Sequence, residues 1–174
     1  GVDHVAVDEC KKRGICVCNA AGYSTNAVSE LVFGLIISLY RKINEGKENM
    51  TSGVKMAPGI ELSGKKFGII GTGAIGLKTA EIAKTFGCEV YAYDPVAVEE
   101  SKRRIGDAIH YAKDIYDAVV DADALMLVTE WKEFRMPSWS AIKKLMATPL
   151  VLDGRNIYDI KEMEENGFVY HCIG

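Results

Sequence analysis

Three glycines and one carboxylate carry the clearest chemistry in this sequence. Gly71, Gly73 and Gly76 follow the spacing G-x-G-x-x-G, and Asp94 comes 18 residues after the last of them. Between a strand and a helix, the first glycine permits a tight turn and the second lets the backbone approach a pyrophosphate. The third allows the helix to pack closely on the strand. The unpaired N–H groups of the first helical turn would then face the phosphates.

The residues around this motif supply the strand and the helix that it requires. An apolar run from Phe67 to Ile70 predicts a buried strand, Ile75 to Phe86 has helical spacing, and Glu89 to Tyr93 predicts a second strand. A carboxylate after that second strand can accept hydrogen bonds from the adenosine ribose and repel a 2′-phosphate, which favours NAD over NADP. Two alternatives stay open: a glycine turn that serves packing alone, and an intact site that stays empty.

After Asp94 the sequence keeps alternating between strand and helix patterns. Strands are predicted at 109–111, 124–128, 150–152 and 168–172, and helices at 95–105, 113–120, 138–146 and 161–165. Buried strands that alternate with helices are typical of a parallel sheet covered on both faces. The predicted fold class is α/β, a doubly wound parallel six-stranded sheet, Rossmann-like, over residues 59–174.

Residues 1–58 are predicted to form an N-terminal extension. It would contain a helix over 7–13, a short strand over 14–18, a helix over about 25–46 and a polar linker to residue 58. The 25–46 helix is apolar on nearly every face, so it needs cover on all sides. We therefore expect a homodimer through this helix, with Leu31, Phe33, Ile36 and Tyr40 in the interface.

Composition narrows the range of partners. The chain has 174 residues, 48% of them hydrophobic and 26% charged, and its net charge of −3 gives no reason to expect nucleic acid or an anionic membrane. The longest apolar run, Leu31 to Leu39, is too short to cross a bilayer. Without a signal peptide a cytoplasmic location is expected, and the missing initiator methionine indicates a processed product or a fragment.

The cysteines and histidines lack the spacing of a metal or catalytic site. The cysteines form no C-x-x-C pair and are expected to be free thiols. They are Cys10, Cys16, Cys18, Cys88 and Cys172. The histidines, His4, His110 and His171, are isolated from one another. We predict no metal ion and no catalytic residue.

The first half of the chain resembles the NAD-dependent D-2-hydroxyacid dehydrogenases. The resemblance covers about residues 1–95 and rests on Gly1–Val5, Gly22–Leu31, Leu62–Lys65 and Gly71–Gly76, which occur in the family's order. It implies the end of a substrate domain, a crossover helix used in dimerisation and the first half of a cofactor domain. The family's later substrate-binding arginine, its glutamate and its Pro-His histidine have no counterpart here.

The second half resembles the C-terminal, UDP-binding domain of UDP-glucose dehydrogenases. This resemblance runs from about residue 91 to 174 and rests on Tyr93–Pro95, Ala122–Leu125, Val128–Arg135 and Leu152–Asn156. It implies that Arg155 lies beside UDP, so a UDP-sugar is a further candidate ligand. Because Tyr93–Pro95 fits both families, the sequence is interpreted as an engineered hybrid joined near 93–95.

The residues expected to bind a dinucleotide are Gly71, Gly73, Ala74, Ile75, Gly76, Asp94, Pro95, Thr129 and Arg155. In NAD-binding Rossmann domains, the adenosine half of the dinucleotide lies on the first βαβ unit and the nicotinamide over the second. The expected function is an NAD(H)-binding domain derived from dehydrogenases, without full catalytic machinery. The alternatives are a folded hybrid that binds no nucleotide and a weakly active oxidoreductase fragment of either family.

Overall fold

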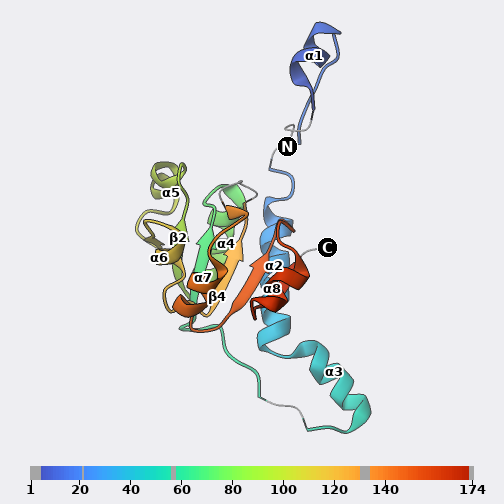
Figure 1. Cartoon of the computed structure of the whole chain (residues 1–174), viewed down its shortest axis with the longest axis vertical. Helices are drawn as coiled ribbons and strands as arrows, with labels where there is room; N and C mark the ends of the chain where they lie inside the picture. The colour runs from blue at the N-terminus through green and yellow to red at the C-terminus, as the bar shows by residue number, and fades with distance from the viewer. Residues whose placement is uncertain (1–4, 21, 56–57, 130–133, 173–174) are drawn as a thin grey trace.

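Six parallel strands form one sheet at the centre of the molecule (Figure 1). The computed structural model describes residues 5–20, 22–55, 58–129 and 134–172. The strands are β1 (Lys66–Ile70), β2 (Glu89–Tyr93), β3 (His110–Tyr111), β4 (Ala124–Leu127), β5 (Leu150–Asp153) and β6 (Val169–Cys172). Their order across the sheet is β3-β2-β1-β4-β5-β6. This order confirms the predicted doubly wound sheet and places the reversal of strand order between β1 and β4.

The sheet separates two buried cores. Met126 and Leu152 point into the core on one face, and Leu125 and Val151 point into the core on the other. On the first face lie α2 (Thr25–Tyr40), α4 (Ala74–Thr85) and α5 (Val98–Ile105); on the second lie α6 (Ile115–Ala118), α7 (Trp139–Leu145) and α8 (Ile160–Glu165). Strands buried on both faces explain why β4 and β5 read as continuous apolar runs.

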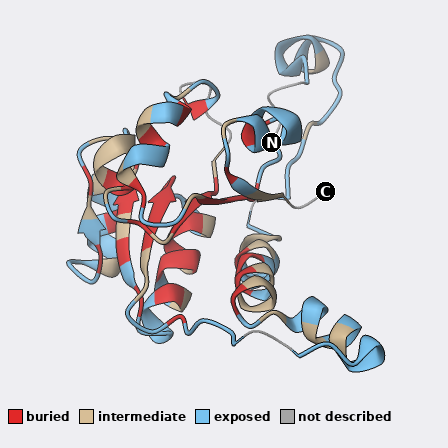
Figure 2. Ribbon diagram, turned by 60° about the horizontal axis from the view of Figure 1, so that its bottom comes forward, coloured by how far each residue is buried: buried red, intermediate tan, exposed pale blue. Residues whose placement is uncertain are grey.

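Helix α2 is part of this layered body. Right-handed crossovers place α4 and α5 over the β1–β3 half and the later helices on the opposite face. The first face of β4 and β5 therefore has no crossover helix, and α2 fills that place. Its Val32 and Ile36 are buried in the same core as Met126 and Leu152, and Figure 2 shows its buried side.

Polar contacts fix both ends of α2. Near its start, the Ser29 hydroxyl donates to the Ile75 carbonyl oxygen at 3.3 Å, and at its end the Tyr40 hydroxyl donates to the Asp123 carbonyl oxygen at 3.2 Å. The predicted interface residues Phe33, Ile36 and Tyr40 are 4%, 0% and 7% exposed. The prediction that these three side chains face a second copy is therefore wrong, because they face this chain's own core.

The segment after α1 (Val7–Lys12) differs from its prediction. Residues 15–20 are irregular, so the strand predicted over 14–18 is not formed. The alternation of Ile15 and Val17 with cysteines is typical of a strand, but a strand needs a neighbour to satisfy its backbone groups. The two edges of the sheet are β3 and β6, and α1 lies well away from both (Figure 1).

A further helix, α3 (Ile43–Ser52), occupies most of the predicted linker. Helix α2 ends at Tyr40 instead of near residue 46, and Lys42, with a φ of 53°, turns the chain into α3. The α3 sequence is mostly polar, with Ile43 and Met50 as its large apolar residues, so it lacks the apolar periodicity from which a helix is predicted. None of its residues is buried. Within the described parts of the chain, no helix is long and apolar enough to span a bilayer.

Candidate functional site

The glycine turn lies where the predicted motif requires it, between the end of β1 and the start of α4. Gly71 has a φ of 95°, a backbone conformation that residues other than glycine rarely adopt. A Cβ on Gly76 would collide with the carbonyl oxygen of Gly71 and lie 3.2 Å from Val128 Cγ2. The first and third glycines therefore do the two jobs predicted for them, a tight turn and close packing of the helix on the strand.

The N-terminus of α4 is open. Gly73 is its N-cap and no side chain caps it, so the N–H groups of the first turn have no partner within the helix. Gly73 and Ala74 are exposed, and a Cβ built on Gly73 would meet no atom within 4 Å. The first turn of this 12-residue helix also carries no acidic residue. The arrangement leaves room for an anion at the positive end of the helix dipole.

The Asp94 carboxylate accepts hydrogen bonds from the backbone of two loops, the glycine turn after β1 and the loop after β2. Its Oδ2 accepts a hydrogen bond from the Thr72 N–H at 2.7 Å, and its Oδ1 accepts from the N–H groups of Val96 and Ala97 at 2.9 and 2.8 Å. Burial, which leaves the residue 9% exposed, acts to raise its pKa, but the hydrogen bonds from Thr72, Ala97 and Val96 outweigh it. The net result is a lowered pKa and a carboxylate that stays charged.

These contacts also explain why α5 begins at Val98 and not at Pro95. The carboxylate of Asp94 holds residues 95–97 in a turn that its own side chain caps, so the chain becomes helical only afterwards. Pro95 lies in this turn and is exposed.

Ser101 and Thr72 are site residues that the sequence reasoning missed. Ser101, on α5, is fully buried, and its hydroxyl lies 2.7 Å from the Thr72 hydroxyl, 2.7 Å from the Ala97 carbonyl oxygen and 3.2 Å from the Thr72 carbonyl oxygen. Because a serine has one hydroxyl proton, it donates to one of these acceptors at a time. Thr72 is thus held at its N–H by Asp94 and at its hydroxyl by Ser101. The only signal in the sequence is a serine within an otherwise charged helix, and that signal does not identify its partner.

Thr129 lies opposite the glycine turn at the switch point, the place between β1 and β4 where the strand order reverses. It follows β4, and a Cβ on Gly71 would come within 2.8 Å of the Thr129 Cβ. The structure therefore brings Thr129 together with Gly71, Thr72 and Asp94. The neighbouring residues 130–133, which belong to the Val128–Arg135 segment of the UDP-glucose dehydrogenase resemblance, lie outside the described residues.

Arg155 lies one strand further away, in the loop after β5. Asp153, 1% exposed, orders this loop: it accepts from the Arg155 N–H at 2.7 Å, the Ile157 N–H at 2.8 Å and the Tyr170 hydroxyl at 2.8 Å. Burial, together with this bond to Asp153, raises the pKa of Tyr170. Asp153 thus does for the loop after β5 what Asp94 does for the loop after β2.

Among the described residues, the two histidines and Cys88 lie away from the glycine turn. His110 stacks on Tyr91 with ring centroids 4.4 Å apart on the β3 side of the sheet, and His171 lies on the opposite edge strand, where burial lowers its pKa. Burial also raises the pKa of the Cys88 thiol to about 11, and this thiol donates to the Leu62 carbonyl oxygen. Such a thiol is unreactive at neutral pH.

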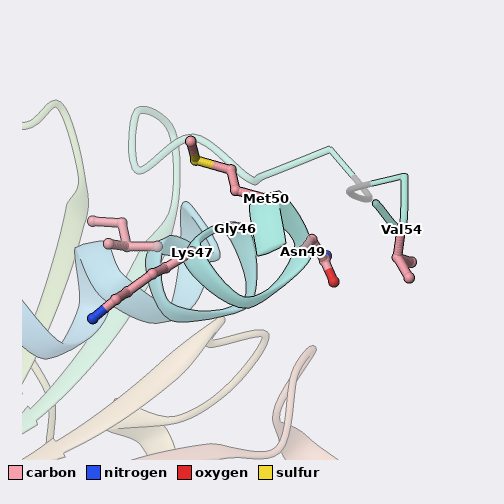
Figure 3. Close-up of a pocket in the computed structure, with 6 residues that line it drawn as sticks. Gly46, Lys47, Asn49, Met50 and Val54 are labelled. Atoms are coloured by element: carbon pink, nitrogen blue, oxygen red, sulfur yellow. The ribbon is translucent and has the colours of Figure 1, made fainter. Parts of the chain in front are cut away.

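One hollow lies along the exposed helix α3 (Figure 3). It measures about 460 Å³ and lies along α3 and the residues that follow it. Its lining is Ile43, Gly46, Lys47, Asn49, Met50 and Val54. Met50 is 87% exposed, and apart from Lys47 the lining offers no ionisable group, so this hollow is no candidate for chemistry.

Comparison with known proteins gives two family matches. Residues 1–110 match the D-isomer specific 2-hydroxyacid dehydrogenase, catalytic domain, and residues 74–160 match the UDP-glucose/GDP-mannose dehydrogenase family, UDP binding domain. Both resemblances noted in the sequence are confirmed. The two matches overlap over residues 74–110, which contain α4, β2 and Asp94.

Individual relatives of both kinds are found. The UDP-glucose 6-dehydrogenase TuaD of Bacillus subtilis is 38% identical over 88 residues, covering 51% of this chain and 19% of its own. The D-3-phosphoglycerate dehydrogenase of Methanocaldococcus jannaschii is 35% identical over 130 residues, covering 73% of this chain and 24% of its own. The chain therefore spans about a fifth to a quarter of the length of these relatives.

Solved structures share the fold. The D-lactate dehydrogenase of Lactobacillus jensenii with NAD+ has a TM-score of 0.77 at 25% identity, covering 100% of this chain and 56% of that chain. The apo D-lactate dehydrogenase of Escherichia coli has a TM-score of 0.73 at 24% identity, covering 95% and 53%. The chain thus shares its fold with these dehydrogenases.

Proposed function

Residues 1–110 of this chain belong to the D-isomer specific 2-hydroxyacid dehydrogenase family and residues 74–160 to the UDP-glucose/GDP-mannose dehydrogenase family, and from this premise we propose that the chain binds NAD(H) at the β1–α4 turn. The observation that carries the proposal is the open N-terminus of α4. Gly73 leaves its Cβ position vacant beside N–H groups that no side chain caps. A pyrophosphate needs that combination of close backbone approach and free donors.

The carboxylate of Asp94 supports NAD over NADP. Its lowered pKa keeps it negatively charged at neutral pH, and it lies at the end of β2, where an adenosine ribose would approach. A 2′-phosphate there would meet the like charge of the Asp94 carboxylate, which accepts hydrogen bonds from the backbone N–H groups of Thr72, Val96 and Ala97, none of which is a basic residue. Ribose hydroxyls, by contrast, can use the acceptor capacity that a carboxylate retains beyond three hydrogen bonds.

We further propose that this domain grips the cofactor without turning over a substrate. Bound NAD supplies a hydride acceptor, but removing a proton from an alcohol needs a base within hydrogen-bond reach of the reacting group. Of the described histidines, His110 and His171 lie toward opposite edges of the sheet. Thr129 and Arg155, which follow β4 and β5, would contact the nicotinamide half and provide no such base. We expect adenosine recognition to dominate and the affinity for NAD to be weak.

Calorimetric titration of the chain with NAD, ADP-ribose and UDP-glucose tests the proposal. Heat with NAD and ADP-ribose, and none with UDP-glucose, is the expected result. Heat with UDP-glucose alone would replace the proposal with a UDP-sugar site beside Arg155, the alternative favoured by the UDP binding domain match. Absence of heat with all three would leave a folded hybrid without a nucleotide ligand.

The presence of two family matches in one chain also concerns how the chain arose. We infer that the chain is a hybrid in which residues 74–110, including α4 and β2, are shared between the two families. Its engineered origin stays a prediction, which one uninterrupted natural gene for all 174 residues would contradict. A homodimer through α2 stays a proposal as well. It now rests on Leu31, 44% exposed, and its exposed neighbours, because the other expected contacts are buried.

A further inference from the structure

Two exposed thiols lie side by side in the segment after α1. The sulfur atoms of Cys16 and Cys18 are 3.6 Å apart, and both residues are exposed. Although this segment is not a strand, its backbone places the two alternate side chains on one side. The pair lies outside both cores and far along the chain from the glycine turn, so the nucleotide site does not account for it.

The separation of the sulfurs suits a shared metal ion better than a bond between them. Two sulfurs bound to one tetrahedral ion at about 2.3 Å lie about 3.8 Å apart. The observed 3.6 Å needs almost no adjustment to reach that value. A disulfide would instead require the sulfurs to close to about 2.05 Å, with a backbone shift in an i, i+2 pair.

The chemistry of the pair selects the class of ion. Thiolates are soft donors and prefer thiophilic cations to magnesium or calcium. Binding replaces each S–H bond with a metal–sulfur bond and releases one proton from each thiol to solvent. Among the described residues no group of three or more His, Cys, Asp or Glu side chains could hold a metal ion, so the remaining coordination positions would be taken by water or small anions.

We propose that Cys16 and Cys18 form a two-thiolate chelate for one divalent d10 cation of the Zn²⁺ or Cd²⁺ type. The site is open on the solvent side, which makes the ion exchangeable. This differs from a structural zinc site, in which protein ligands fill all four positions. The site does not depend on the proposed nucleotide binding.

Cadmium titration of the whole chain in a phosphine reductant tests the chelate through the ultraviolet charge-transfer absorption of cadmium–thiolate bonds. The expected result is an absorption that saturates at one ion per chain and is displaced by Zn²⁺. Cys16→Ser and Cys18→Ser should each weaken cadmium binding at least tenfold. The matched control is Cys10→Ser, a third cysteine of the same N-terminal segment, which should leave the titration unchanged.

Three outcomes would overturn the chelate. One is the absence of the absorption in the wild-type chain. Another is an unchanged titration when both Cys16 and Cys18 are replaced by serine. The third is an equal loss in Cys10→Ser, which would place the site elsewhere. Because both thiols are exposed and outside the cores, their serine variants should fold normally, as circular dichroism would verify.

Discussion

The Thr72 N–H donates a 2.7 Å hydrogen bond to the carboxylate of Asp94, and this bond joins the glycine turn after β1 to the end of β2. Ser101 on α5 holds the other side of Thr72. The central residue of the turn is thus fixed from two elements before any ligand arrives. Such preorganisation lowers the entropic cost of binding a phosphate group at the turn.

Asp94→Asn should destabilise the chain by about 1–3 kcal/mol at pH 7. In the wild type both carboxylate oxygens accept hydrogen bonds from backbone N–H groups, whereas in the variant the amide NH₂ would replace one of these acceptors with a donor. The carboxylate has a lowered pKa in the folded chain, so its contribution is complete above its unfolded value of about 3.8 and is lost as the pH falls through the lower folded value. Urea unfolding at pH 7 and at pH 2–3 measures both effects. A stability gap that stays constant down to pH 2 would contradict this role.

Gly76→Ala should lower the free energy of unfolding by several kcal/mol, because its Cβ would collide with the Gly71 carbonyl oxygen and the helix would have to move off the strand. Gly73→Ala is the matched control: its Cβ meets nothing, so stability should change by less than about 0.5 kcal/mol. Thermal unfolding of both variants decides the point. Equal stabilities would show that the helix does not pack on the turn as described.

Ser101→Ala should cost about 1–2 kcal/mol of stability by removing a buried hydroxyl that bonds to the Thr72 hydroxyl, and it should also weaken ADP-ribose binding by loosening the turn. Arg103→Ala, on the exposed side of the same helix, controls for loss of helix stability. Urea unfolding and calorimetry on both variants give the two readouts. If Ser101→Ala matches the control in both, the serine does not position the turn.

Ile36→Ala should destabilise the chain by about 2–5 kcal/mol, because Ile36 is fully buried between α2 and the sheet. Leu31→Ala, on the exposed side of the same helix, should leave stability nearly unchanged and weaken the proposed dimer. Light scattering over a concentration series measures assembly, and thermal unfolding measures stability. A wild-type chain that stays monomeric at high concentration would refute the dimer.

The sheet could be predicted from the sequence because its central strands β1, β4 and β5 are buried on both faces and its strands alternate with helices. The glycine turn could also be predicted, because the spacing of its glycines reflects where the backbone needs a positive φ or a close approach. The irregular conformation of residues 15–20 and the helix α3 could not be predicted, for opposite reasons. Ile15 and Val17 alternate as in a strand, but the segment pairs with no strand of the sheet. Helix α3, in contrast, is helical although it buries no apolar face.

The contacts within the site were less accessible to sequence reasoning. That Asp94 follows β2 could be predicted, but its bond to Thr72 depends on how β1 and β2 align. Ser101 meets Thr72 only because α5 packs back over the turn. The orientation of α2 was misjudged for a similar reason: a helix apolar all round gives no sign of which side its own sheet will cover.

The most direct test of nucleotide binding is calorimetric titration of ADP-ribose into the wild-type chain and into Gly73→Ala. Steric room at Gly73 is the basis of the proposed pyrophosphate contact, and the variant should keep its fold. We expect measurable heat with the wild type and a loss of at least tenfold in affinity with Gly73→Ala. Equal affinities in the two proteins would place the ligand elsewhere and contradict the account.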